Sequence, residues 1–140
     1  ARELGCQVGD EWVQISGLRT LGDDGMPICL ANVYVIPDYG SIAQRLGGSS
    51  RPVYEMIAET FKESIENITI RLTAGVLSEQ KAAILGAEPG SPSLSVSRFY
   101  QGRGGRIFEA SISEHPASNF SYTFEFTRGW QTADHWSWNN

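Results

Sequence analysis

The sequence has few residues of the kinds that build disulfides or metal sites. Its 140 residues include two cysteines, Cys6 and Cys29, and two histidines, His115 and His135. Two cysteines are too few for a disulfide framework, they lack the spacing of metal ligands, and no second histidine or cysteine lies near His115 in the sequence. We therefore expect reduced cysteines, a cytoplasmic protein, and no bound metal or cofactor.

Long apolar runs and an excess of positive charge are also missing. No apolar run approaches the ~20 residues that a bilayer-spanning helix needs. The formal net charge is −5, whereas proteins that contact nucleic acid directly usually carry a basic patch. A membrane role and direct DNA binding are not expected, so any work on DNA requires another segment.

Common catalytic and phosphate-binding motifs are absent. The sequence contains no GxSxG elbow, no Walker-type loop and no dinucleotide fingerprint. The glycine-rich run 102–105 joins two predicted strands instead of opening a helix, so it predicts a hairpin turn and not a phosphate cradle. No internal repeat is visible, and a chain of this length fits one domain that buries roughly 68% of its unfolded surface.

The most informative stretch is 84–126, which predicts three consecutive antiparallel strands. Apolar and polar residues alternate from Leu94 onward, as they do along a half-buried strand. The returning strand, 107–113, places Glu109 and Ser111 on one face with Ser113. This polar face with an acid is either exposed to solvent or lines a ligand cavity, and the pattern alone leaves both open.

The rest of the chain alternates between strand and helix patterns. Periodicity and turn residues predict a hairpin of strands 11–21 and 28–36. A short helix 39–46 with Asp38 as its N-cap and a helix that begins at Pro52 are expected to follow. A strand 66–76 and a helix 79–85 between Ser78 and Gly86 complete this part of the chain.

Two arginines lie on faces that are otherwise apolar. Arg19 shares its side of the first strand with Val13 and Ile15, and Arg98 shares its side with Val96. A guanidinium on such a face needs an acid, a carbonyl or an anionic ligand, because stranding the charge is costly. For Arg98, an ion pair with Glu109 across the hairpin and contact with a ligand both remain possible.

The order of several segments resembles one family. These segments are 12–27 (WVQISGLRTLGDDGMP), 78–92 (SEQKAAILGAEPGSP), and LSVSRFYQGRGGRIFEASIS followed by HPASNFSYTFEF within 94–126. Together they are similar to the UTRA domain, the effector-sensing part of GntR-type transcription regulators of the HutC subfamily. The resemblance implies an α+β fold: a chorismate lyase-like antiparallel sheet of about six strands with flanking helices, with residues 1–140 forming one effector-binding and dimerisation domain.

The function implied by the resemblance is regulatory and not catalytic. Such a domain forms a homodimer, binds a small-molecule effector, and reaches operator DNA, often as a repressor, only through an N-terminal winged helix-turn-helix that is absent from this chain. Two other functions stay open. One is a lyase-like enzyme that uses Glu109 or His115, and the other is a ligand-free dimerisation module whose cavity is filled by Phe99, Phe108 and Tyr122.

The site residues follow from the same resemblance. Where sugar-phosphate-sensing relatives carry two arginines in an R-x-R pattern, this chain has Gly17 and Arg19, and where they carry an acid four residues after a proline, it has Ala31. The acid of the penultimate strand matches Glu109, and the tyrosine six residues beyond it is replaced by His115. The expected effector is therefore smaller and less charged than a sugar phosphate, a carboxylate or amino-acid-like metabolite. Its expected contacts are Arg19, Arg98, Glu109, Ser111 and His115.

Overall fold

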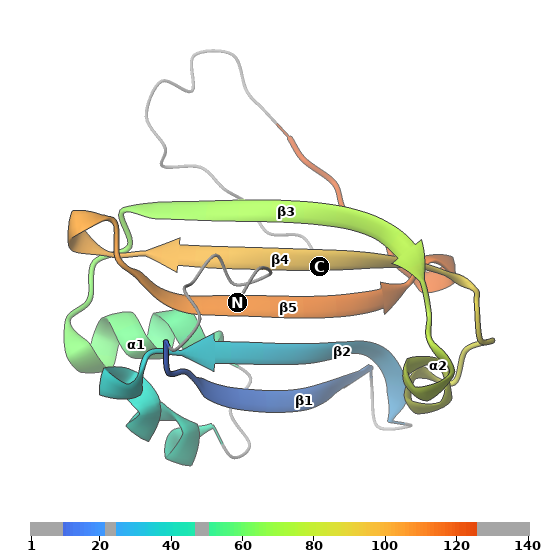
Figure 1. The fold of residues 1–140 in the computed structure, drawn as a ribbon, viewed down its shortest axis with the longest axis horizontal. Helices are drawn as coiled ribbons and strands as arrows, with labels where there is room; N and C mark the ends of the chain where they lie inside the picture. Colours follow the sequence, from blue (N-terminus) through green and yellow to red (C-terminus); the bar gives the residue numbers. More distant parts are fainter. Residues whose placement is uncertain (1–9, 22–24, 47–50, 126–140) are drawn as a thin grey trace.

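The fold is an antiparallel sheet with helices at its two ends, as Figure 1 shows. A computed structural model describes residues 10–21, 25–46 and 51–125. Within these residues the sheet has five strands in the order β1-β2-β5-β4-β3. The elements are β1 (Val13–Leu21), β2 (Met26–Val35), the 3-10 helix η1 (Pro37–Arg45), α1 (Val53–Phe61), β3 (Asn67–Val76), α2 (Glu79–Leu85), β4 (Pro92–Gln101), the short 3-10 turn η2 (Arg103–Gly105), β5 (Ile107–Pro116) and the 3-10 turn η3 (Ala117–Asn119).

Both predicted hairpins form. Strands β1 and β2 pair antiparallel from Val13 opposite Val35 onward, and β4 pairs with β5 across the glycine-rich turn. Gly104 and Gly105 adopt positive φ angles of 73° and 76°, which glycine reaches without steric cost, so the chain reverses within a few residues. The hairpins place the alternating faces of four strands in one sheet.

Helix α2 begins and ends where its flanking residues predict, and α1 begins after Pro52 as predicted. The Ser78 hydroxyl accepts a hydrogen bond of 3.3 Å from the Lys81 amide at the start of α2, and Gly86 ends that helix with φ 63°. Helix α1 follows Pro52, and its C-cap, Lys62, is left-handed with φ 56°. Gly86 is thus a local stop signal for α2, whereas the left-handed conformation of Lys62 after α1 is seen only in the structure.

The segment 39–46 differs from its prediction. It forms a 3-10 helix that already begins at Pro37, and its N-cap is Ile36 and not Asp38. Proline has a fixed φ and no amide hydrogen, so it suits the first helical position and moves the start of the turn upstream. The Asp38 carboxylate instead pairs with the Arg106 guanidinium at 2.8 Å. The predicted N-cap is therefore wrong, whereas a short helix is present at the predicted place, as a 3-10 helix that begins two residues earlier.

The α+β class with an antiparallel sheet is confirmed, and the sheet has five strands within the described residues where about six were expected. The predicted third closing strand is not formed there, since a 3-10 turn ends at Asn119 and residues 120–125 pair with no strand. The aromatic rings of that segment contact one another instead: Phe120 and Tyr122 have centroids 6.3 Å apart, and Tyr122 and Phe124 have centroids 4.7 Å apart. The segment 120–125 thus brings alternate aromatic rings into edge and tilted contact without pairing to a strand.

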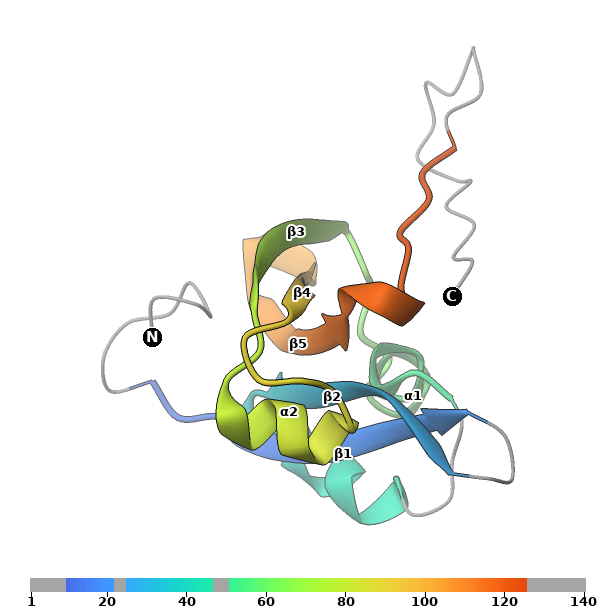
Figure 2. The ribbon, with the colours of Figure 1, turned by 90° about the vertical axis from the view of Figure 1, so that its right-hand side faces the viewer.

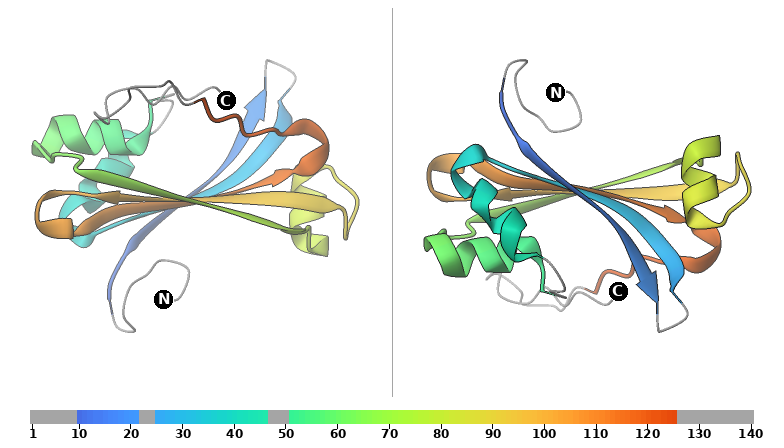
Figure 3. Two further views of the ribbon diagram at one scale, coloured as in Figure 1. Left: turned by 90° about the horizontal axis from the view of Figure 1, so that it is seen from above. Right: turned by 90° about the horizontal axis from the view of Figure 1, so that it is seen from below.

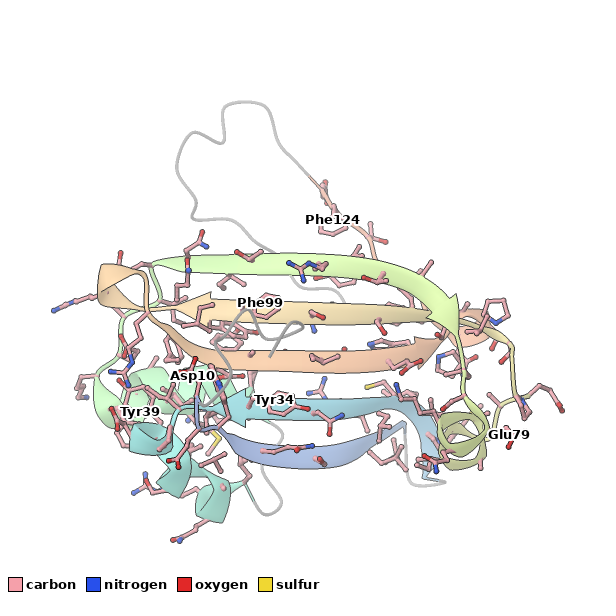
Figure 4. All side chains as sticks on the ribbon, in the orientation of Figure 1. Asp10, Tyr34, Tyr39, Glu79, Phe99 and Phe124 are labelled. Atoms are coloured by element: carbon pink, nitrogen blue, oxygen red, sulfur yellow. The ribbon has the colours of Figure 1, made fainter. Side chains whose placement is uncertain are left out.

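Two apolar clusters hold the helices against the sheet. The larger lies at the end of the sheet where α1 and η1 gather, and its buried members are Val35, Ile36, Ile42, Ile57, Tyr100 and Phe108. The smaller packs α2 through Leu77, Ala82 and Leu85 at the opposite end. Tyr39 and Glu79 mark these two ends in Figure 4. Neither cluster therefore packs a helix of the described residues onto the middle of the sheet.

The two sides of the sheet are covered differently. Figures 2 and 3 show α1 and the segment that follows β5 on the same side of the sheet.

None of the described helices is long and apolar enough to cross a membrane. Cys6, His135 and the tryptophans after Arg128 lie outside the described residues, as do the predicted loops at 22–24 and 47–50.

Candidate functional site

A cavity of about 500 Å³ lies between the sheet and the start of α1. Its floor is formed by β1, β2, β4 and β5, and its other wall by Leu46 and residues 51–55. The polar and ionisable side chains on its lining are Ser16, Arg19, Cys29, Arg51, Tyr54, Glu55, Arg98, Tyr100, Glu109, Ser111, Ser113 and His115. The volume is in the range of small-molecule sites.

All five residues predicted from the sequence line this one cavity. Arg19 comes from β1, Arg98 from β4, and Glu109, Ser111 and His115 from β5. They meet because successive side chains of a strand alternate between faces, so residues 109, 111 and 115 of β5 point the same way. The polar face of 107–113 is therefore a cavity wall and not a solvent-exposed surface. That these residues bind an effector stays a prediction.

Glu109 is the most buried ionisable group of the cavity. It is 2% exposed, it lies opposite Val35 and Tyr100 in the neighbouring strands, and its Oε2 atom has no hydrogen-bond partner. Burial raises its pKa from 4.5 to about 8, because removing a carboxylate from water disfavours the charged form. Near neutral pH the ligand-free carboxyl is mainly protonated.

The ion pair between Arg98 and Glu109 that the sequence left open is not formed. Arg98 lies opposite Ser111, and Glu109 makes no ion pair within the part of the chain that the structure describes. The Arg98 guanidinium is half-buried and lies 5.8 Å from the centroid of the Tyr122 ring. Arg19 is exposed at the rim of the cavity, opposite Cys29. The cavity thus has one half-buried and one exposed cation on its floor.

His115 lies toward the end of β5 and is neutral at physiological pH. Its ring stacks on Phe120 with centroids 3.7 Å apart, and its Nε2 atom forms a hydrogen bond of 3.0 Å with the Ser113 hydroxyl. Burial lowers its pKa to about 4, and the charges of Arg98 and Arg19 lower it further. The imidazole can therefore accept or donate one hydrogen bond, depending on its tautomer.

Several residues of the cavity were not identified from the sequence. Tyr54 of α1 stacks on Tyr100 with centroids 4.7 Å apart, and so holds the helix over the floor beside Glu109. Its place three residues before Ile57, on the apolar stripe of the helix, is a sequence signal that could have pointed to it. Cys29 is a buried free thiol, and burial raises its pKa. Nothing local in the sequence connects Cys29 to the cavity, because that contact depends on strand order.

The aromatic residues that would fill the cavity of a ligand-free module do not line it. Phe108 is part of the core cluster beneath α1 and η1. Phe99 belongs to the other face of β4, where the Arg71 guanidinium lies 5.6 Å from its ring centroid. Tyr122 is beside Arg98 but is not among the lining residues.

Among residues 10–21, 25–46 and 51–125, no three His, Cys, Asp or Glu side chains are grouped to hold a metal ion.

Comparison with known proteins identifies the family. A family model described as the UTRA domain matches residues 1–121. Comparison with curated proteins gives no match. Among solved structures, the ligand-binding domain of a protein assigned to the GntR family from Bordetella bronchiseptica is 25% identical, with a TM-score of 0.72 over 90% of this chain and 81% of that chain.

Two further structures support the fold. A GntR-family transcriptional regulator from Enterococcus faecalis V583 is 21% identical with a TM-score of 0.73, over 89% of this chain and 88% of that chain. Another from Bacillus cereus is 20% identical with a TM-score of 0.74, over 90% of this chain and 86% of that chain. At these identities the likeness shows the fold, and the family model that matches residues 1–121 shows the membership: the chain belongs to the UTRA domain family.

Proposed function

We propose that this chain is the effector-sensing domain of a GntR-type transcription regulator of the HutC kind, and that it binds a small metabolite that carries a carboxylate. The observation that carries the proposal is the cavity of about 500 Å³, whose floor places Arg19 and Arg98 among polar groups of β5. The match to the UTRA family and the likeness to a domain described as ligand-binding support a sensor function for this cavity.

A carboxylate suits the cations of the cavity. A planar guanidinium forms two parallel hydrogen bonds with a carboxylate, which gives both strength and orientation. Arg51 also lines the cavity, but its guanidinium already pairs with Glu59 at 2.8 Å. Gly17 and Ala31, which stand where sugar-phosphate sensors have a second arginine and an acid, both lie on the lining. A smaller and less charged ligand than a sugar phosphate therefore fits these residues.

The proposed mechanism is allosteric. The cavity is enclosed by the sheet on one side and by the start of α1 on the other, so a ligand that contacts both changes the free energy of their relative positions. In a homodimer joined to N-terminal winged helices, such a change alters the spacing of the DNA-binding segments and the affinity for the operator. Coupling energies of this kind are typically about 1–3 kcal/mol. A repressor in the cytoplasm is the form of the proposal that we favour.

The test is calorimetric titration with a panel of small mono- and dicarboxylate metabolites. We expect at least one to bind, and we expect the Arg19→Ala variant to lose that binding. The Arg98→Ala variant tests the half-buried cation in the same way. Arg103→Ala is the matched control, because Arg103 is an exposed arginine of the β4–β5 turn outside the lining. Unchanged affinity in Arg19→Ala would contradict the assignment of the carboxylate to Arg19.

One observation favours an enzyme as the second candidate. Glu109 is a buried carboxyl whose pKa is raised to about 8, which is also a property of general acids. The chorismate lyase-like alternative predicts turnover of an aromatic acid by the isolated domain. We expect chromatography after incubation to recover such an acid unchanged, and any Glu109-dependent product would favour the enzyme.

A further inference from the structure

The ionisable groups of the cavity are ordered along its floor. Strand β5 presents Glu109, Ser111, Ser113 and His115 in succession, and the Cα atoms of Glu109 and His115 are six residues apart, or about 20 Å at roughly 3.3 Å per residue. Arg98 lies opposite Ser111, two residues from Glu109 along β5, at about 7 Å. Thus an acid occupies one end of the floor and cations begin at its middle.

The positive charges of Arg98 and Arg19 also affect the ionisable groups at the His115 end of the floor. Both lower the pKa of His115, and both act on Cys29, which lies opposite Arg19. No cation forms an ion pair with Glu109 in the described residues. One end of the floor, beneath Tyr54, therefore carries the carboxyl of Glu109. The part of the floor from Arg98 to Arg19 carries positive charge.

At the Glu109 end of the floor, one carboxyl oxygen lacks a hydrogen-bond partner. The Oε2 atom of Glu109 is buried without a partner, Tyr100 lies beside this residue in β4, and Tyr54 and Glu55 of α1 line the same cavity. The Tyr54 hydroxyl already donates to Glu55, with an oxygen–oxygen distance of 3.3 Å. A buried polar atom left unpaired costs free energy that a ligand donor can recover. When Glu109 is ionised, the partner that its carboxylate lacks is a hydrogen-bond donor.

We propose that the effector is a zwitterion that lies along the floor, with a protonated nitrogen donating to Glu109 and a carboxylate facing Arg98 and Arg19. This inference rests on the proposed function, since it assumes that the cations hold the carboxylate, and it adds a second charged group and a fixed orientation. A cationic nitrogen satisfies the orphaned Oε2 atom and neutralises the carboxylate that burial otherwise disfavours. A plain carboxylate satisfies only the arginine end.

The arrangement links binding to proton release. Burial raises the pKa of Glu109 to about 8, so at pH 7 the free protein holds this proton in about nine of ten molecules. A cation at Oε2 favours the ionised form, and the proton leaves when the zwitterion binds. The other ionisable groups of the cavity are Arg19, Cys29, Arg51, Tyr54, Glu55, Arg98, Tyr100 and His115. His115 is neutral at pH 7 because its pKa is about 4, so it contributes little to the release.

The experiment uses three matched series as probes: ω-amino acids from glycine to 6-aminohexanoate, the carboxylates of the same chain lengths without the amine, and the corresponding alkylamines without the carboxylate. Each is titrated calorimetrically at pH 7 in phosphate and in Tris, whose different ionisation enthalpies reveal proton exchange. We expect one ω-amino acid to bind at least about tenfold more tightly than both of its matched analogues. We expect it to release close to one proton, and we expect the plain carboxylates to release none.

The Glu109→Gln variant should remove the amine-dependent gain and the proton release, while affinity for the plain carboxylate stays within about twofold. Glu88→Gln is the control, because Glu88 is exposed in the turn before β4. Carboxylates that bind through Arg19 as tightly as the amino acids would overturn the zwitterion and leave the proposed function standing. Binding of amines alone would contradict the carboxylate assignment, and no binding in any series up to 10 mM would overturn both. Proton release by the wild type remains a readout if Glu109→Gln does not fold.

Discussion

Glu109 lies directly opposite Tyr100 in the β4–β5 pair, and the ring of Tyr54 stacks on Tyr100 at 4.7 Å. Strand pairing and helix packing thus place two aromatic rings over one carboxyl. Glu109 is buried beside these rings, and that desolvation is the cause of its raised pKa. The protonation of Glu109 therefore bears on both the stability of the fold and the binding of a ligand.

The first prediction concerns the stability of the ligand-free protein against pH. Because the pKa of Glu109 is raised from 4.5 to about 8, the folded state holds more protons than the unfolded state between these values. The contribution of Glu109 to stability is therefore fully present below pH 4.5 and is lost as the pH rises toward 8. The loss is at most about 5 kcal/mol. Urea unfolding between pH 5 and 8.5 measures it.

Glu109→Gln should flatten this slope, since the amide has nearly the same shape and does not titrate. Glu88→Gln, on an exposed turn residue, should keep the wild-type slope. Equal slopes in the wild type and in Glu109→Gln would show that the carboxyl is hydrated in the ligand-free protein, contrary to its burial.

The second prediction has the opposite sign. The pKa of His115 falls from 6.5 to about 4 in the folded protein, so the unfolded state binds the proton more readily between these values. Stability from this group is present above pH 6.5 and is lost as the pH falls to 4, by at most about 3 kcal/mol. His115→Phe keeps a ring to stack on Phe120 and removes the titration. Measured in the Glu109→Gln background, the loss between pH 6.5 and 4 should shrink in this variant, and an unchanged loss would rule out His115 as its source.

Much of the architecture could be predicted from the sequence because its signals are local. Ser78 and Gly86 determine where α2 begins and ends, and the alternation of β5 places Glu109 and Ser111 on one face. The prediction of a third closing strand was wrong because apolar alternation also suits a segment whose rings contact one another without strand pairing, as those of Phe120, Tyr122 and Phe124 do. Only strand pairing, which depends on distant residues, decides between the two.

The site was predictable in part for the same reason. Residues of β5 share a face by period two, and the resemblance to a family supplied Arg19. The contact of Cys29 and Tyr54 with the same cavity depends on β2 lying beside β5 and on α1 packing over both. Strand order is a long-range property, so no local pattern around Cys29 could show its contact, whereas the place of Tyr54 on the apolar stripe of its helix was a local signal.

The third prediction tests an ion pair outside the cavity. Glu114 is 8% exposed, accepts a hydrogen bond of 3.2 Å from the Ser93 hydroxyl, and pairs with Lys81 of α2. Lys81→Ala leaves a nearly buried carboxylate without its cation and should destabilise the protein by about 1–3 kcal/mol, less than a fully buried pair because Lys81 is partly exposed. Urea unfolding at pH 7 measures the loss. The double variant Lys81→Ala/Glu114→Gln should recover at least half of it, and a double variant no more stable than Lys81→Ala would place the effect in helix packing.

The last prediction distinguishes a change in effector affinity from a change in the stability of the fold. Ala31 lies on the floor opposite Ser113, and it contributes a small side chain to the lining. A leucine at this position projects into a space of about 500 Å³, so it adds apolar contacts without overpacking the core. Ala31→Leu should lower the affinity for the effector at least about tenfold while the free energy of unfolding changes by less than about 1 kcal/mol. Ala83→Leu on the exposed side of α2 should leave both unchanged. If Ala31→Leu binds as tightly as the wild type, the effector does not occupy this part of the cavity.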